Sequence, residues 1–456
     1  MAAAKDFSIE PKKTRIIETP YRRIRTAIPH PDSLPTLMKL REHESRSMRG
    51  QPPVVWHRAY GFQIEDAFGN KWVDWSSGVV AINAGHNHPR IVKALQDYLA
   101  SGAPLMTYCF PSEVRAKLAE KLVGIAPKEL DRVFLMTTGA EAVEVAIKLA
   151  RTHGTRMNPR KRYLISYEGA FHGRTYGAQL AGTPMEWMDP NPYFLQMPFP
   201  GSIDTKDKRF DVFVNRLKDR NVAADEVAGV LAETFQGREA KLMPIAYAQA
   251  LRAWCTEYKV ALIADEVQAA FGRTGKLFAF EHYGIVPELV CCGKGITSSL
   301  PLSAVLGRAE YMDQYGPGEM TSTHTGSPLP TVSALASIEA ILEDKLIEHA
   351  AELGPYLQGE LEKIAQPYRD RIEVGGVGLV AAMLFFNNRE QLTPDPDAAF
   401  RFCEQCLLGG NLFFAPVGKG YGAIKFCPPL CISKEAIKDA LYGPAGIKET
   451  LDKVMA

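Results

Sequence analysis

Short apolar runs alternate with helical patterns through the middle of this chain, and this alternation constrains its fold more than any other feature. Most of the runs are near-continuously apolar, which is typical of strands covered on both faces. Helical stretches such as 141–151 and 244–258 separate them. The pattern predicts an α/β fold with a doubly wound, mainly parallel sheet. The predicted strands are residues 132–138, 162–167, 229–233, 260–267, 289–293 and 302–307.

The pattern changes after about residue 330, where a long helical stretch is followed by helices and short strands. The 456 residues accommodate two or three domains at about 150 residues each. We therefore expect a large sheet domain over 76–329 and a smaller α+β domain over 330–456. The N-terminal segment 1–75 is expected to belong to the smaller domain.

The charges nearly cancel, with 53 Lys and Arg against 52 Asp and Glu. Such a chain has no general electrostatic attraction to nucleic acid or to a membrane surface, so neither is an expected partner. The longest apolar stretch, 378–386, is far shorter than the ~20 residues of a spanning helix. Residues 1–30 contain no apolar signal segment, so we expect a cytoplasmic protein. The eight cysteines predict neither a disulfide scaffold nor a metal site.

Ligands in open α/β sheets bind beyond the carboxyl ends of the strands, so the residues that follow each predicted strand carry the functional prediction. Gly139 and Ala140 begin a helix whose free N–H groups and dipole suit a phosphate, although an ordinary small-residue turn is the alternative. Asp265 closes another apolar strand, where a carboxylate must be paired or ligated. A nucleoside triphosphate site would need a Gly-x4-Gly-Lys-Ser/Thr loop, which this sequence lacks.

Lys294 lies between two glycines directly after an apolar strand. Glycines permit the close approach of a planar ligand, and a lysine in that place is available for a Schiff base. An exposed loop lysine is the alternative. The hydroxyl-rich turn over 321–328 could donate to a phosphate, although such turns are also common helix caps.

These features, with the aromatic-histidine pair Phe171-His172, together indicate a site for pyridoxal 5′-phosphate. This cofactor is an electron sink whose ring nitrogen must stay protonated, which an apposed aspartate ensures. Its flat ring also needs a stacking partner.

The chain resembles the class III (ω-amino acid) aminotransferases, which are pyridoxal-phosphate enzymes of fold type I, from about residue 50 to its C-terminus. The most specific block is LIADEVQAAFGRTGK over 262–276, which leads to Lys294. Shorter matching blocks are residues 75–89, 138–141, 171–175, 236–237 and 322–323. The resemblance implies a large cofactor-binding domain and a smaller α+β domain.

The resemblance also implies roles for the residues around the cofactor. Lys294 would hold the cofactor covalently and carry the α-proton, and Asp265 would pair with the ring nitrogen. Gln268 would contact the phenolic oxygen of the cofactor. The backbone N–H groups of Gly139 and Ala140 would bind its phosphate.

Four further roles follow from the same resemblance. Phe171 would stack on the ring, with His172 supporting it. Thr323 would reach the phosphate of the neighbouring subunit, which implies a homodimer with shared active sites and leaves higher oligomers open. Arg174 matches the family arginine that binds the substrate carboxylate distal to the reacting amine.

Two positions depart from the family pattern. Arg238 stands where the family usually has a gating Glu, and Lys425 stands where it usually has the Arg that binds the α-carboxylate. Two cations would make this side of the pocket permanently positive and favour substrates with a carboxylate at each end. In the alternative, Arg238 points to solvent or pairs with Glu239, and Lys425 alone binds the acceptor.

The resemblance implies transfer of an amino group from an ω-amino acid, such as 4-aminobutyrate, to a 2-oxo acid, such as 2-oxoglutarate. The reaction would run in two ping-pong halves through a Schiff base on Lys294. An amino-acid racemase or epimerase of the same fold, using the same Lys294 and Asp265, is the alternative. A binding protein without catalytic activity is disfavoured, because Lys294 is retained.

Overall fold

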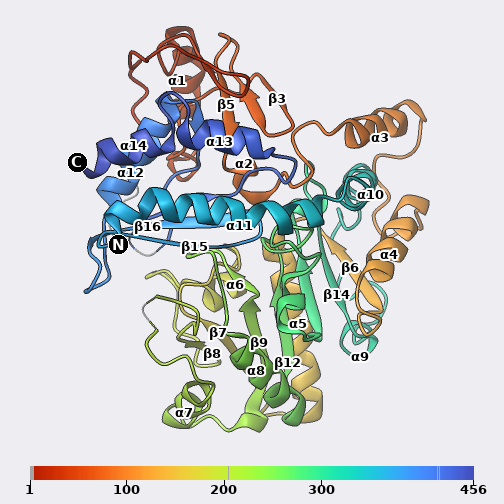
Figure 1. Ribbon diagram of the computed structural model, residues 1–456. Helices are drawn as coiled ribbons and strands as arrows, with labels where there is room; N and C mark the ends of the chain where they lie inside the picture. The colour runs from red at the N-terminus through yellow and green to blue at the C-terminus, as the bar shows by residue number, and fades with distance from the viewer. Residues whose placement is uncertain (1–4, 204, 419, 421) are drawn as a thin grey trace. The chain divides into compact units, whose positions relative to one another are not determined.

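The computed structural model describes residues 5–203, 205–418, 420 and 422–456 (Figure 1). The chain divides into two compact units, one formed by Met1–His88 with Glu348–Ala456 and the other by Pro89–Ile347. The domain limits expected from the sequence, after residues 75 and 329, stay a prediction.

A seven-stranded sheet forms the centre of the Pro89–Ile347 unit, in the order β6-β14-β13-β12-β9-β7-β8. Among the residues that the structure describes, β14 alone runs antiparallel to its neighbours in this sheet. The strands are β6 (Arg132–Met136), β7 (Tyr163–Tyr167), β8 (Phe194–Met197), β9 (Val227–Glu233), β12 (Ala261–Asp265), β13 (Leu289–Cys292) and β14 (Ser303–Gly307). The predicted α/β fold with a mainly parallel sheet is confirmed.

Helices cover both faces of this sheet, which explains why its strands are apolar throughout. Every residue of β9 and β12 is buried. Alternate strand residues such as Leu231 and Ile263 pack with α5 (Gly139–Met157), whereas their neighbours Val230 and Leu262 pack with α7 (Asp211–Asp219) and α8 (Ile245–Glu257). Figure 1 shows α5 and α8 beside these central strands.

All six predicted strands are present, within a few residues of their expected limits. The sequence did not predict β8, because this four-residue edge strand pairs only with β7 and is largely half-buried, so it lacks a continuous apolar run. A two-stranded hairpin, β10 (Phe235–Gln236) with β11 (Lys241–Leu242), follows β9.

The remaining elements of this unit are helices. They are α3 (Pro89–Ala100), α4 (Glu113–Ile125), α6 (Tyr176–Ala181), α9 (Ala309–Met312), α10 (Pro328–Glu343) and the 3-10 turns η3 (Ala224–Glu226), η4 (Ala279–Tyr283) and η5 (Lys294–Ile296). The long helical pattern predicted after residue 330 is α10, which begins two residues earlier.

Two sheets form the other unit. One has the order β1-β2-β5-β4-β3 with β18 paired to β5, and the other has β15-β16-β17 with β19 paired to β16. Their strands are β1 (Ile17–Glu18), β2 (Arg23–Ile24), β3 (Arg58–Tyr60), β4 (Gln63–Glu65), β5 (Lys71–Asp74), β15 (Ile372–Val377), β16 (Val380–Asn388), β17 (Thr393–Pro394), β18 (Asn411–Leu412) and β19 (Ala423–Phe426). Its helices are α1 (Leu34–His43), α2 (Ser77–Val80), α12 (Pro396–Leu408), α13 (Lys434–Tyr442), α14 (Ile447–Met455) and α11 (Leu346–Ala365), which begins just before the boundary.

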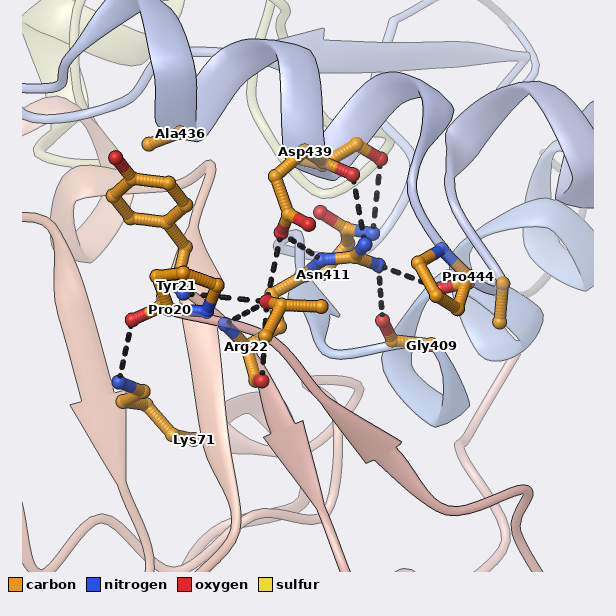
Figure 2. A network of polar contacts seen from close by, with 12 residues as sticks. Pro20, Tyr21, Arg22, Lys71, Gly409, Asn411, Ala436, Asp439 and Pro444 are labelled. Atoms are coloured by element: carbon orange, nitrogen blue, oxygen red, sulfur yellow. Dashed lines mark hydrogen bonds and ion pairs between the residues drawn. The ribbon is translucent and has the colours of Figure 1, made fainter.

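The buried Arg22 joins the two ends of the chain inside this unit (Figure 2). Its Nε donates to the Asp439 carboxylate at 2.8 Å, and its Nη2 donates to the Asp439 carbonyl at 2.7 Å. Its Nη1 donates to the carbonyls of Gly409 and Pro444 at 2.8 and 3.2 Å. A guanidinium buried without such partners would cost several kcal/mol, so these contacts hold the N-terminal strands against α13.

In the part of the chain that is described, no helix combines the length and apolar character needed to cross a membrane.

Candidate active site

The first turn of α5 follows β6 at the carboxyl edge of the sheet and forms an anion-binding position. Thr138 caps the helix: its hydroxyl accepts from the Glu141 N–H at 3.3 Å, and the Glu141 carboxylate accepts from the Thr138 N–H at 2.8 Å. A Cβ at Gly139 would lie 2.7 Å from Cγ1 of Val267, so only glycine fits there. The helix N-terminus is therefore fixed, and its Gly139 position carries no side chain that could hinder an anion from approaching the N–H groups of Gly139 and Ala140.

Val267 connects this turn to two other strand ends. Val267 lies two residues after Asp265. A Cβ built on Gly293, the residue before Lys294, would lie 3.3 Å from Cγ1 of Val267. That same Cβ would lie 3.6 Å from Cα of Gly139. The structure thus brings the predicted phosphate turn, aspartate strand and lysine turn together around one valine.

Asp265 is buried at the end of β12 and is held from two sides. His172 Nδ1 lies 2.7 Å from its Oδ2, and the Val267 N–H donates to its Oδ1 at 3.0 Å. The His172 ring is buried too, and its Nε2 has no hydrogen-bond partner among the residues that the structure describes. The contact between His172 and Asp265 fixes the carboxylate. It leaves His172 Nε2 as a buried polar atom that needs a partner other than the described residues, such as a bound ligand or water.

The loop that carries Phe171 and His172 packs against the first turn of α5. Gly173 has a φ of +131°, and a Cβ there would lie 2.5 Å from Cβ of Ala140. This contact requires glycine and holds the loop beside the phosphate turn. Phe171 is 47% exposed, so a face of its ring is open for stacking.

Lys294 opens η5 directly after β13, and its backbone is strained. Its φ of +46° lies in the left-handed region, which a residue with a side chain rarely adopts. Strain of this kind is typical of functional positions. Burial raises the pKa of the thiols of Cys291 and Cys292 well above the ordinary value, so neither is a nucleophile beside it.

The predicted residues Gln268 and Arg238 lie around the β10–β11 hairpin. A Cβ on Gly237 would lie 2.8 Å from Oε1 of Gln268, so the amide packs directly on this backbone. Arg238 donates to Oε1 of the buried Glu239 at 2.5 Å and to the Ser202 hydroxyl at 2.9 Å. Of the two arrangements considered from the sequence, the pairing of Arg238 with Glu239 is the one present.

Three predicted residues lie away from these buried contacts. The Arg174 guanidinium is exposed and lies 5.1 Å over the Phe171 ring. Thr323 is exposed in the turn before α10. Lys425 lies in β19 of the other unit, so its place in the site stays a prediction.

Sequence reasoning assigned no role to Glu266, which follows Asp265 and is fully buried. Its carboxylate accepts from the N–H groups of Ala279 and Phe280, both at 2.9 Å, and so fixes η4 to the end of β12. Burial raises its pKa to about 7, although the two backbone hydrogen bonds and the Thr234 hydroxyl lower it. The adjacent acidic pair in the sequence was the available signal.

These residues fit pyridoxal phosphate. A side-chain-free helix start suits the phosphate, a buried aspartate suits the ring nitrogen, and an exposed aromatic face suits the ring. Fold and site together define a pyridoxal-phosphate enzyme of fold type I.

Comparisons with known proteins identify the family. The family model described as aminotransferase class-III matches residues 45–443. A probable 4-aminobutyrate aminotransferase of Bacillus subtilis (strain 168) is 30% identical over 400 residues, which cover 84% of this chain and 89% of the relative. An alanine/serine racemase of Pyrococcus horikoshii is 31% identical over 420 residues, covering 88% and 86%.

Among solved structures, an amine transaminase from an uncultivated Pseudomonas species in its PLP-bound form has a TM-score of 0.79 and 25% identity, covering 88% of this chain and 94% of that one. The chain belongs to the class III aminotransferase family. It is a pyridoxal-phosphate-dependent aminotransferase.

Ionisation of Glu266 should destabilise the fold as the pH rises. The folded chain binds this proton more tightly than the unfolded chain, because the carboxyl pKa is about 7 in the fold against an ordinary 4.5. The free energy of unfolding therefore falls between these two pH values and levels off above them. At about 1.4 kcal/mol per pKa unit, the loss is on the order of 3 kcal/mol.

Thermal midpoints of wild type and Glu266→Gln between pH 5 and 8 measure this effect. The midpoint of the variant minus that of wild type should become more positive as the pH rises. Glu257→Gln removes an exposed carboxylate at the end of α8 and should show no such trend. A difference between Glu266→Gln and wild type that stays constant with pH would contradict the prediction.

Proposed function

We propose that this aminotransferase moves an amino group from an ω-amino acid of the 4-aminobutyrate type to a 2-oxo acid such as 2-oxoglutarate. The observation that carries the proposal is Arg174, whose exposed guanidinium lies over the ring of Phe171. No carboxylate among the described residues pairs with it. A free cation beside a stacking face is suited to a substrate that carries a carboxylate at the end away from its amine. The 4-aminobutyrate relative supports the same substrate class.

Each residue of the site has a proposed part in this reaction. Pyridoxal phosphate supplies the electron sink that stabilises charge on the carbon losing its proton. Lys294 would hold the cofactor through Nζ and, once the substrate amine has displaced it, its free Nζ would carry that proton. The Asp265 carboxylate, held by His172, keeps a proton on the ring nitrogen. The N–H groups of Gly139 and Ala140 bind the phosphate.

Two side chains complete the proposed cofactor site. Phe171 covers one face of the ring, and Gln268, supported by the Gly237 backbone, contacts the phenolic oxygen.

A racemase or epimerase is the second candidate, and the alanine/serine racemase relative favours it. Such an enzyme would use the same Lys294 and Asp265 but would need no 2-oxo acid. Chiral analysis of each amino acid, with and without an added 2-oxo acid, separates the two reactions. Inversion without an acceptor would replace the proposed function by racemisation.

Borohydride reduction of the purified protein should fix the cofactor on Lys294, and peptide mapping should find the adduct there. Lys294→Ala should lower kcat by several orders of magnitude, because the variant loses both the attachment point and the proton carrier. Lys276→Ala, on an exposed lysine of the same motif, should keep the adduct and the turnover. An adduct on another lysine would refute the assignment.

We further propose a homodimer in which Thr323 of each subunit binds the phosphate of the other, with its exposure in the single chain as support. Thr323→Asp and Lys294→Ala should each be inactive, the first because its carboxylate would repel the phosphate. A mixed dimer would have one site with both changes and one site with neither. Mixing should therefore restore up to half of the activity per mixed dimer. No recovery, with subunit exchange demonstrated by mass, would mean that each chain builds its own site.

Carboxylate recognition is expected to rest on Arg174 and Lys425, because Glu239 already neutralises Arg238. Arg174→Ala should raise KM for 4-aminobutyrate and 2-oxoglutarate by ~10-fold or more, consistent with loss of a charge-assisted hydrogen bond of about 1.5–3 kcal/mol. Lys425→Ala should raise KM for the 2-oxo acid only. A similar rise in KM for the 2-oxo acid in Arg238→Ala would mean that Arg238 also binds the substrate, and would contradict this expectation.

A further inference from the structure

We propose that Ser333 and Ser337 of α10 are positioning residues for Lys294, an inference that rests on the proposed role of Lys294. Both serines are fully buried, and they lie four residues apart on one face of the helix. That face meets the turn 294–299, which carries the lysine.

Each serine binds one hydroxyl and one backbone carbonyl of the turn. Ser333 donates to the Thr297 carbonyl at 3.2 Å and lies 2.5 Å from the Ser299 hydroxyl. Ser337 donates to the Gly295 carbonyl at 3.4 Å and lies 2.9 Å from the Ser298 hydroxyl. The two serines of the helix thus attach to consecutive parts of the turn.

The turn needs such attachment because its backbone is strained at two places. Lys294 has a φ of +46° and Ser298 a φ of +51°, and the left-handed region is unfavourable for a residue with a side chain. Within the turn, the Ile296 N–H donates to the Gly293 carbonyl at 3.1 Å, and the Thr297 N–H donates to the Lys294 carbonyl at 3.4 Å, which is long for a backbone hydrogen bond. Surrounding structure must supply the rest of the stabilisation.

The Thr297 carbonyl also accepts from the Ser299 hydroxyl at 3.2 Å, and the Gly295 carbonyl also accepts from the Ser298 hydroxyl at 3.4 Å. Loss of a helix hydroxyl would therefore remove the donor that connects the carbonyl to α10, and leave the donor within the turn. Without its hydrogen bonds to α10, the strained turn would be held by its internal hydrogen bonds alone and could relax toward an ordinary conformation. That movement would swing the start of the Lys294 side chain, since the side chain leaves the backbone at the strained residue. Proton transfer by Nζ should suffer most, because it depends on placement, whereas substrate binding should change little.

The test compares the holoenzymes of wild type, Ser333→Ala, Ser337→Ala and the double variant. Thr331→Val is the matched control, since Thr331 is buried on the same helix but donates only to the Ser327 carbonyl at the helix start. Hydrogen exchange followed by mass spectrometry on peptides covering 293–300 reports the turn directly. We expect at least 10-fold faster exchange in the double variant and wild-type exchange in the control.

Kinetics give a second readout. The double variant should lower kcat about 10-fold and change KM for the amino donor less than 2-fold. Ser333→Thr keeps a hydroxyl at this position and should therefore lose less kcat than Ser333→Ala. A fall in thermal midpoint with wild-type exchange and kcat would mean a merely structural role and would overturn the inference. If borohydride mapping of wild type finds no adduct on Lys294, the proposed function itself fails, which is a separate result.

Discussion

Close approach of three chain segments around Val267 is the constraint on which the rest of the site depends. Gly139 and Gly293 lie so near this valine that a side chain at the first would clash and at the second would be tight. The parallel register places Asp265 level with Cys291, so the aspartate and the lysine turn leave the sheet at the same edge. A wider spacing would separate the helix start, the carboxylate and the lysine, and no single ligand could touch all three.

Three buried carboxylates at this edge have close partners. Asp265 has His172, Glu266 has two backbone N–H groups, and Glu239 has Arg238 and Ser202. Balance of this kind is required, because a buried charge without a partner costs several kcal/mol. Arg238 is paired in this way with Glu239, whereas the Arg174 guanidinium is exposed over the Phe171 ring.

The strained backbone at Lys294 and the helix α10 that contacts its turn both belong to the Pro89–Ile347 unit. The left-handed backbone at Lys294 is followed by a turn whose carbonyls and hydroxyls meet a helix, and the fixed loop before α6 depends on Gly173 against Ala140. Each functional side chain therefore starts from backbone that its neighbours hold in place. The site is preorganised by packing rather than by the residues of the motif alone.

The sequence by itself determined most of the central sheet and predicted the residue types of the candidate site. Near-continuous apolar runs identified six of its seven strands, because strands buried on both faces leave that pattern, whereas the half-buried edge strand β8 does not. Asp265, His172, Lys294 and Gly139 were predicted as site residues because their residue types and places near strand ends suit one cofactor. Only the tertiary structure decided that Arg238 pairs with Glu239, that Glu266 is buried, and that Ser333 and Ser337 meet the lysine turn. Those contacts join segments far apart in the chain or depend on which way a side chain turns, and neither leaves a pattern in the order of the residues.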